Sequence, residues 1–220
     1  MIFFDVDTQV DFMHPEEGAL YVKGADEIAG NIEKLLSAAG VLGITTVSTS
    51  CAHEADDPEF EIFPPHCIEG TRGAERLHHD LPALPRRVVH ATASEDPEAK
   101  LSPATHYVVK KRVFDPFSNR WLDGLRKGGA FSGEHAIVFG VATDYCVRAT
   151  ALGLKEGGAE VEVVEDAIRG VSDETTRTSL GELDVSGIRL TTTDEVLRQV
   201  KELQDGATME LPGDKIRGQN

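Results

Sequence analysis

The sequence has little of what marks secreted, membrane-spanning or nucleic-acid-binding proteins. It contains only 3 cysteines in 220 residues, too few for a disulfide framework. No apolar run approaches the ~20 residues that cross a bilayer. Basic residues number 22 against 38 acidic ones, which gives a formal net charge of -16. A surface of this sign repels phosphate backbones and anionic lipids, so we expect neither nucleic acid nor membrane as a partner.

The features that remain are those of an ordinary globular chain. Hydrophobic residues make up 40% and charged residues 27% of the sequence, and 220 residues can bury a sizeable core in one domain. The N-terminal sequence MIFFDVD has no basic segment, so we expect no signal peptide and a cytoplasmic protein with reduced thiols. The three cysteines, Cys51, Cys67 and Cys146, are therefore candidates for nucleophile, metal ligand or packing residue.

Short apolar strands alternate with helical patterns along the chain. The predicted strands lie at 2–7, 44–50, 87–90, 106–110, 135–141, 161–164 and 188–191. The predicted helices lie at 24–39, 119–127, 144–156, 172–183 and 193–203. This alternation predicts an α/β fold, a single-domain three-layer α/β/α structure with a central, mostly parallel, Rossmann-like sheet.

We assign residues 1–204 to this domain. Residues 51–105 interrupt the alternation and are rich in histidine, proline and charge. Because long loops in compact domains are usually functional, we predict that they form an active-site loop region. Residues 205–220 are predicted to be a poorly ordered C-terminal tail.

Reactive side chains gather where the predicted strands end. Asp7, Cys51 and Lys111 follow three strands, and Cys146 follows a fourth. Alone, each has an ordinary explanation as a cap, a solvated charge or a packing residue. Ligands of open parallel sheets bind beyond the carboxyl ends of the strands, so the convergence of these residues favours a site.

Cys146 lies in a sequence that favours reactivity. In GVATDYC a buried strand ends and a helix opens, with Thr143 or Asp144 as N-cap. The first turn of a helix favours thiolate over thiol, and its backbone N–H groups can hold a developing oxyanion. A buried packing cysteine remains the alternative from position alone.

The segments DVDTQVDF, PHCIEGTRGAE and GVATDYCVRATALGL resemble the isochorismatase-like cysteine hydrolases, and among them the nicotinamidases (pyrazinamidases). The resemblance runs from about residue 2 to about residue 190. It implies an isochorismatase-type fold and a catalytic triad of Asp7, Lys111 and Cys146. Lys111 is chosen over Lys110 because the family's lysine precedes a phenylalanine by six residues, and Phe117 has that spacing from Lys111.

The resemblance also implies a cis peptide bond between Val141 and Ala142, which turns the N–H groups of Ala142 and Cys146 toward one oxyanion. True isochorismatases lack this cysteine, so Cys146 favours amide hydrolysis over vinyl-ether hydrolysis. The implied reaction converts nicotinamide to nicotinate and ammonia through a thioester. Phe12 and Phe63, with Tyr145 as a weaker candidate, fall where the family places the walls around the ring.

A divalent metal, most simply zinc, is expected in the loop region. His53 and His66 provide two imidazoles, and Cys51 is the expected third ligand. The family's metal-binding nicotinamidases have Asp-x-His where this chain has Cys51-Ala52-His53, and a thiolate favours zinc over harder cations. A carboxylate, from Glu59 or Glu61, is the alternative to sulfur.

Two other functions remain open at this point. One is a metal-independent amidohydrolase of another small amide or ureido compound, which Cys51 in place of aspartate favours. The other is a phospho-receiver domain, suggested by Asp5, Asp7, Asp57 and Lys111, although this leaves the Cys146 motif unused. For the leading hypothesis we expect a small-molecule amide as the substrate and a homo-oligomeric enzyme.

Overall fold

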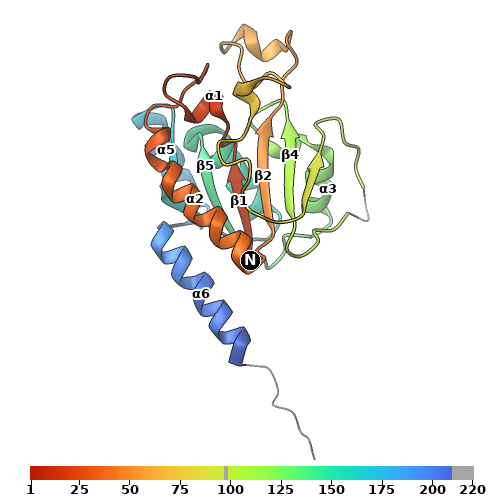
Figure 1. The fold of residues 1–220 in the computed structure, drawn as a ribbon, viewed down its shortest axis with the longest axis vertical. Coiled ribbons are helices and arrows are strands. Elements are labelled where there is room, and N and C mark those ends of the chain that lie inside the picture. Colours follow the sequence, from red (N-terminus) through yellow and green to blue (C-terminus); the bar gives the residue numbers. More distant parts are fainter. Residues whose placement is uncertain (97–98, 210–220) are drawn as a thin grey trace, which may run out of the picture.

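The computed structural model describes residues 1–96 and 99–209, in which one sheet lies between layers of helices (Figure 1). The strands are β1 (Ile2–Val6), β2 (Thr46–Cys51), β3 (Arg86–Val89), β4 (His106–Lys111), β5 (His135–Val141), β6 (Glu160–Arg169) and β7 (Arg189–Thr191). The α-helices are α1 (Val10–Met13), α2 (Ala25–Leu42), α3 (Arg120–Lys127), α4 (Arg148–Glu156), α5 (Asp173–Val185) and α6 (Thr193–Met209). Short 3₁₀ helices, η1 (Pro58–Glu61), η2 (Arg72–Ala74) and η3 (Pro116–Ser118), and a π-helical turn, η4 (Thr143–Val147), lie in the connections.

The strands form one sheet in the order β3-β4-β2-β1-β5-β6-β7, and each of the described pairings is parallel. One hydrophobic cluster joins a face of the sheet to α1, α2 and α6, and a second joins the other face to α3, α4 and α5. The predicted α/β fold with a central parallel sheet and helices on both faces is therefore confirmed.

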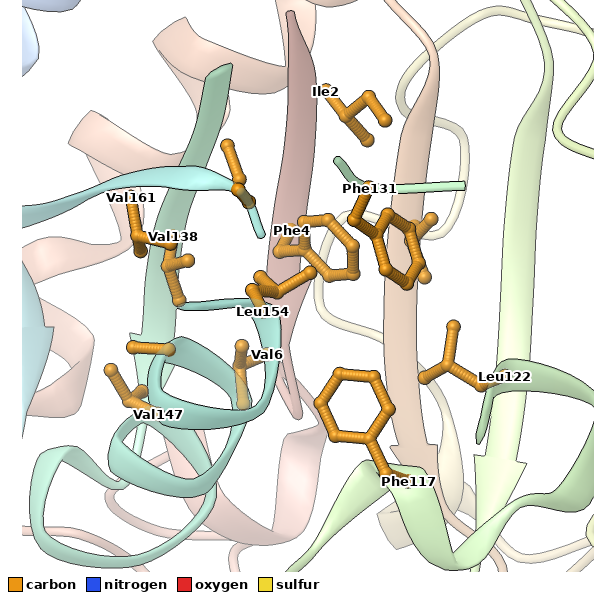
Figure 2. Close-up of a cluster of buried hydrophobic side chains, with 14 of the residues drawn as sticks. Ile2, Phe4, Val6, Phe117, Leu122, Phe131, Val138, Val147, Leu154 and Val161 are labelled. Carbon is orange, nitrogen blue, oxygen red and sulfur yellow. The ribbon is translucent and has the colours of Figure 1, made fainter. Parts of the chain in front are cut away.

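Strand β1 lies at the centre of the sheet and is buried on both faces. Ile2, Phe4 and Val6 point into the cluster that Figure 2 shows, whereas Phe3 belongs to the cluster around α2. Alternate residues of a strand face opposite sides, so a strand that is apolar throughout suits a position between two helical layers. Asp7 consequently follows a strand that is fixed from both sides.

The direction in which strands are added reverses at β1. The first part of the chain places β2, β4 and β3 on one side of β1, and the second part places β5, β6 and β7 on the other. At such a reversal, the loops after neighbouring strands run in opposite directions. This leaves a crevice at the carboxyl edge of the sheet. Residues that follow β1, β2, β4 and β5 therefore share one edge of the molecule.

Strand β6 is longer than predicted. The strand expected at 161–164 is part of Glu160–Arg169, which continues past a register shift opposite Val138 and Gly140. The acidic residue Asp166 is accommodated within this strand because it accepts hydrogen bonds from the Asn31 side chain and the Thr193 backbone N–H. Its carboxylate thereby connects the strand to α2 and α6.

Two helices also differ from the prediction. The helix expected at 144–156 begins as the π-helical turn η4 before continuing as α4. Helix α6 extends to Met209, beyond the predicted end at 203, and residues 210–220 of the predicted tail lie outside the described residues. None of the helices in the described part of the chain has the length and apolar character that a membrane crossing requires.

Gly140 provides a test of the packing between β1 and β5. It has a φ of +117°, and an added Cβ would lie 2.1 Å from the carbonyl oxygen of Val6. We expect Gly140→Ala to lower the free energy of unfolding by roughly 3 kcal/mol or more, because backbone strain and steric overlap act together. Urea-induced unfolding followed by circular dichroism measures this change.

The matched control is Gly30→Ala on α2, where an added Cβ meets no atom within 4 Å. This substitution should stabilise the protein by about 0.5–1 kcal/mol, since alanine favours the helix over glycine. Equal unfolding midpoints for the two variants would show that the β1–β5 contact tolerates a side chain.

Candidate active site

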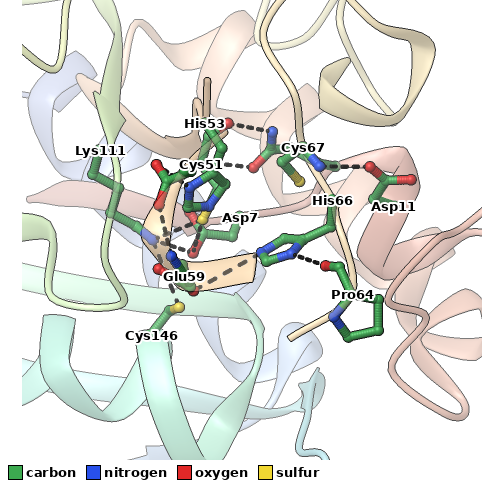
Figure 3. Close-up of polar contacts among 12 residues, drawn as sticks. Asp7, Asp11, Cys51, His53, Glu59, Pro64, His66, Cys67, Lys111 and Cys146 are labelled. Atoms are coloured by element: carbon green, nitrogen blue, oxygen red, sulfur yellow. Dashed lines mark hydrogen bonds and ion pairs between the residues drawn. The ribbon is translucent and has the colours of Figure 1, made fainter. Parts of the chain in front are cut away.

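Asp7, Lys111 and Cys146 meet at the carboxyl edge of the sheet (Figure 3). Asp7 follows β1, Lys111 is the last residue of β4, and Cys146 lies in η4 after β5. Lys111 Nζ lies 2.8 Å from Asp7 Oδ2 and 3.6 Å from Cys146 Sγ. The side chains of Lys111 and Asp7 are 0% and 1% exposed, so the ion pair is almost completely shielded from water.

The backbone and a neighbouring strand hold Asp7 in place. Its φ of +49° lies in the left-handed region, which aspartate tolerates better than most residues. Thr49 Oγ1 donates a 2.7 Å hydrogen bond to Asp7 Oδ1, and the Asp7 N–H donates to the Thr49 carbonyl oxygen. These contacts leave Oδ2 to face Lys111.

Cys146 is buried next to the ion pair of Lys111 and Asp7, and this environment favours its neutral thiol form. Burial raises the pKa of the Cys146 thiol well above its ordinary value, although Lys111 opposes this shift. Burial alone would lower the pKa of Lys111, but the Asp7 carboxylate and the adjacent sulfurs hold it well above the ordinary value. Cys146 is thus a neutral thiol beside a charged pair, and the Asp7 carboxylate, which shares the Lys111 ammonium with it, is the nearby base.

The π-helical turn directs Cys146 toward a pocket. The N–H groups of Tyr145 and Val147 both donate to the Ala142 carbonyl oxygen at 3.1 Å, and Thr150 Oγ1 donates to the Cys146 carbonyl oxygen. The peptide bond between Val141 and Ala142 is cis. Single π-helical turns are rare and often lie at functional sites.

Three possible metal ligands gather in the loop region. Nitrogen atoms of His53 and His66 and a carboxylate oxygen of Glu59 all lie within 4.8 Å of one another. His53 Nδ1 is 3.0 Å from Asp57 Oδ2, and His66 Nδ1 is 2.8 Å from the Pro64 carbonyl oxygen. Such partners fix the rings and turn the Nε2 atoms toward the centre of the group.

The donors fit a divalent cation. His53 Nε2 is buried and has no hydrogen-bond partner among the described residues. Burial lowers the pKa of His66, so its imidazole is neutral and can donate a lone pair. Two imidazoles and one carboxylate are also the ligands of many open zinc sites.

The structure does not bring Cys51 into this donor group, although the sequence analysis expected it there. Its Sγ lies 3.2 Å from Lys111 Nζ and 3.9 Å from Asp7 Oδ2, and burial raises its pKa to about 12. The expectation assumed that the strand continues to His53. Strand β2 instead ends at Cys51, whose sulfur contacts Lys111, whereas His53 pairs with Ile68 in the loop region and its ring lies beside that of His66.

Glu59, rather than Glu61, faces the two histidines. It lies in η1, whose N-cap Asp57 accepts a hydrogen bond from the Glu59 N–H, whereas Glu61 is exposed. The Asp57-Pro58 pair is a recognisable start signal for a helical turn. That signal indicates where η1 begins, but only the folded loop shows which carboxylate turns inward.

Polar side chains at the start of α1 hold this region in place, and sequence reasoning missed them. Asp11 accepts hydrogen bonds from the N–H groups of Cys67 and Ala19. The Gln9 amide donates to the Cys51 carbonyl oxygen and accepts from the Cys51 N–H. Because these bonds link positions 8 to 56 residues apart, no local pattern could have indicated them.

A pocket of about 130 Å³ lies between the thiol and the metal donors. Phe12, Phe63 and Tyr145 line it as proposed for ring walls, together with Phe114, which sequence reasoning missed. The full lining is Phe12, Leu20, Tyr21, Val22, Cys51, Glu59, Phe63, His66, Phe114, Val141, Ala142, Tyr145, Cys146 and Val171. This lining contains no lysine or arginine, so the pocket suits an uncharged, flat molecule.

Known proteins similar to this chain are found along almost its whole length. The family described as the isochorismatase domain matches residues 1–195. The nicotinamidase/pyrazinamidase of Mycobacterium tuberculosis (strain ATCC 25618 / H37Rv) is 29% identical over 191 residues, which cover 84% of this chain and 95% of that protein.

Solved structures with a similar fold include amide hydrolases of the same kind. The pyrazinamidase of Pyrococcus horikoshii in complex with zinc has 27% identity and a TM-score of 0.67, over 87% of this chain and 98% of its own. N-carbamoylsarcosine amidase from Thermoplasma acidophilum has 25% identity and a TM-score of 0.66, over 88% of this chain and 96% of its own. These similarities extend to amide hydrolases with different substrates.

The donor group yields a prediction about metal affinity. We expect Glu59→Ala to weaken zinc binding by more than about 100-fold, since losing a ligand costs more than the ~10–100-fold typical of an outer-shell partner. Glu61→Ala, which removes an exposed carboxylate two residues away, should bind zinc like the unchanged protein. Titration against a chromophoric chelator measures both affinities, and loss of zinc in the Glu61 variant alone would reverse the assignment.

Proposed function

This chain belongs to the isochorismatase family, and we propose that it is an amidohydrolase that converts nicotinamide and water to nicotinate and ammonia. One observation carries the proposal: the Lys111 ammonium contacts both the Asp7 carboxylate and the Cys146 sulfur beside an apolar pocket. A base, a cation and a nucleophile at these distances are the groups that thiol-dependent amide hydrolysis requires. The similarity to nicotinamidases supports this choice of substrate.

The reaction begins with transfer of the Cys146 proton to Asp7. The thiolate attacks the carboxamide carbon, and the backbone N–H groups of Ala142 and Cys146 stabilise the resulting oxyanion. When the C–N bond breaks, the proton on Asp7 passes to the leaving ammonia. Asp7 then takes a proton from a water molecule as the water oxygen attacks the thioester carbon. The C–S bond breaks, Asp7 returns the proton to the departing sulfur, and the nicotinic acid product ionises to nicotinate.

Lys111 has an electrostatic part in every step. Its ammonium stabilises the Asp7 carboxylate before the proton transfer and the Cys146 thiolate after it. Because its side chain is completely buried, these interactions are stronger than they would be in water. Lys111 therefore lets negative charge move between two atoms without solvent rearrangement.

His53, Glu59 and His66 would hold a divalent metal at the far end of the pocket. When bound, the metal supplies a Lewis-acidic position for a ring nitrogen. We favour zinc, since it accepts imidazole and carboxylate ligands together and is present in a similar pyrazinamidase. Without Cys51 as a ligand, the preference for zinc no longer depends on sulfur.

A metal-independent hydrolase of a small amide or ureido compound is the second candidate, and the similarity to N-carbamoylsarcosine amidase favours it. The pocket favours the first candidate, because a substrate with its own carboxylate needs a basic partner and the lining contains none. The phospho-receiver alternative has no support in the family match, and its Asp57 pairs with His53 instead of ending a strand.

Removal of the nucleophile tests the proposed chemistry. Cys146→Ala should abolish ammonia release from nicotinamide while leaving the circular dichroism spectrum and thermal midpoint close to those of the unchanged protein. Ammonia release is measured with a coupled dehydrogenase assay across a panel that includes nicotinamide, pyrazinamide and small ureido acids. More than trace activity in the variant means that Cys146 is not the nucleophile, and activity confined to ureido acids supports the second candidate.

The two neighbouring lysines make a matched pair. Lys111→Ala and Asp7→Asn should each lower kcat by roughly 10³- to 10⁴-fold, the scale on which catalytic triads fail when one member is removed. Lys110→Ala should have little effect, since this side chain lies on the opposite face of β4 and pairs with Glu69. If kcat depends on Lys110 and not on Lys111, the proposed triad is wrong.

A further inference from the structure

The ammonium of Lys111 has three polar partners. Its Nζ lies 2.8 Å from Asp7 Oδ2, 3.2 Å from Cys51 Sγ and 3.6 Å from Cys146 Sγ (Figure 3). An ammonium has three N–H donors and no acceptor, so these contacts can use all of them. The direction of the donor that faces Cys146 therefore depends on how the other two are held.

We propose that Cys51 is a positioning residue for the reaction proposed above. Its sulfur accepts one N–H of Lys111, and Asp7 accepts another, so the third remains directed at the Cys146 sulfur. The role belongs to Cys51 as a partner of Lys111 and not as a metal ligand.

Cys51 is held firmly enough to serve this role. It pairs with Lys111 in the register between β2 and β4, so the two residues lie side by side on neighbouring strands. The Gln9 amide accepts a 2.7 Å hydrogen bond from the Cys51 N–H and donates one of 2.8 Å to its carbonyl oxygen. Because its backbone N–H and carbonyl groups are both hydrogen-bonded, the backbone of Cys51 is held in place and its sulfur stays beside the ammonium.

The chemistry of the position favours a neutral acceptor. Lys111 is fully buried, and a buried ammonium with an unpaired N–H is strongly disfavoured. A carboxylate at position 51 would also satisfy that N–H, but it would place a second negative charge beside Asp7. A thiol satisfies the donor without adding a second negative charge.

The experiment measures the Cys146 thiolate directly and needs no substrate. The rate of alkylation of Cys146 by iodoacetamide is followed by peptide mass spectrometry between neutral and alkaline pH. The titratable and charged groups that face Cys146 are Asp7, Lys111 and Cys51. The proteins compared are the zinc-loaded wild type, Cys51→Ala, Cys51→Ser and Cys51→Val.

Cys51→Ala and Cys51→Val lack the acceptor, so Cys146 should be alkylated roughly 10- to 100-fold more slowly near neutral pH, the range expected for a lost hydrogen bond to a charged group. The pH dependence should shift upward, and kcat should fall with little change in KM. Cys51→Ser keeps an acceptor and should recover most of the rate. Zinc content should be the same in all four proteins.

Valine is close to cysteine in size and suits the end of a strand, so it keeps the test valid if the alanine variant folds poorly. Cys67→Ala is the matched control, because it removes another buried thiol, whose sulfur contacts the Gly73 carbonyl oxygen at 4.0 Å and not the Lys111 ammonium. It should leave the alkylation profile of Cys146 unchanged.

Two results would overturn the proposal. One is an unchanged alkylation profile in Cys51→Ala and Cys51→Val, and the other is loss of zinc from these variants, which would make Cys51 a metal ligand. Failure of the proposed function has a different signature. In that case nicotinamide is not hydrolysed by the wild type, while the dependence of Cys146 alkylation on Cys51 persists.

Discussion

The buried ion pair between Lys111 and Asp7 is the interaction on which the site depends. Asp7 follows β1 and Lys111 ends β4, and β2 lies between these strands. The lysine therefore reaches across the end of β2 to meet the carboxylate. Two charges that are 0% and 1% exposed are tolerated only if their remaining hydrogen-bonding groups are satisfied. Thr49 satisfies one oxygen of Asp7 from β2, and Cys51, two residues later, meets the ammonium.

The two halves of the site meet at one short segment, because Cys51 and His53 are only two positions apart. Cys51 ends β2 and turns toward Lys111, whereas His53, after the strand has ended, turns toward His66 and Glu59. The loop region that carries the metal donors is fixed independently, by Asp11 at Cys67 and by the buried ion pair of Arg76 with Asp5. The pocket therefore has a thiol at one end and nitrogen and oxygen donors at the other, each with its own support.

The sequence was informative where local patterns decide the outcome. Apolar runs located every strand of the sheet, and alternation along β4 agrees with Lys111, since Tyr107 and Val109 share its buried face. Contacts between distant segments determine that Glu59 faces the two histidines and that Cys51 faces Lys111. The spacing of residues in the sequence does not indicate such contacts. The sequence also did not predict that β6 continues through Asp166, because the residues that hydrogen-bond to the Asp166 carboxylate lie on α2 and α6.

Charge gives a reason for the roles proposed for Cys51 and Glu59. The resemblance drawn from the sequence places Asp-x-His where this chain has Cys51-Ala52-His53. Here a carboxylate at that position would lie beside Asp7, and one ammonium would face two negative charges as well as a developing thiolate. With cysteine at position 51, the ammonium still has a third acceptor, but Asp7 is the one carboxylate among its three partners. The carboxylate of the donor group comes instead from Glu59 in η1, so the two histidines still have an acidic partner. Under the proposed function, Cys51 thus supplies a neutral acceptor at the thiol end of the pocket, and Glu59 supplies the negative charge at the donor end.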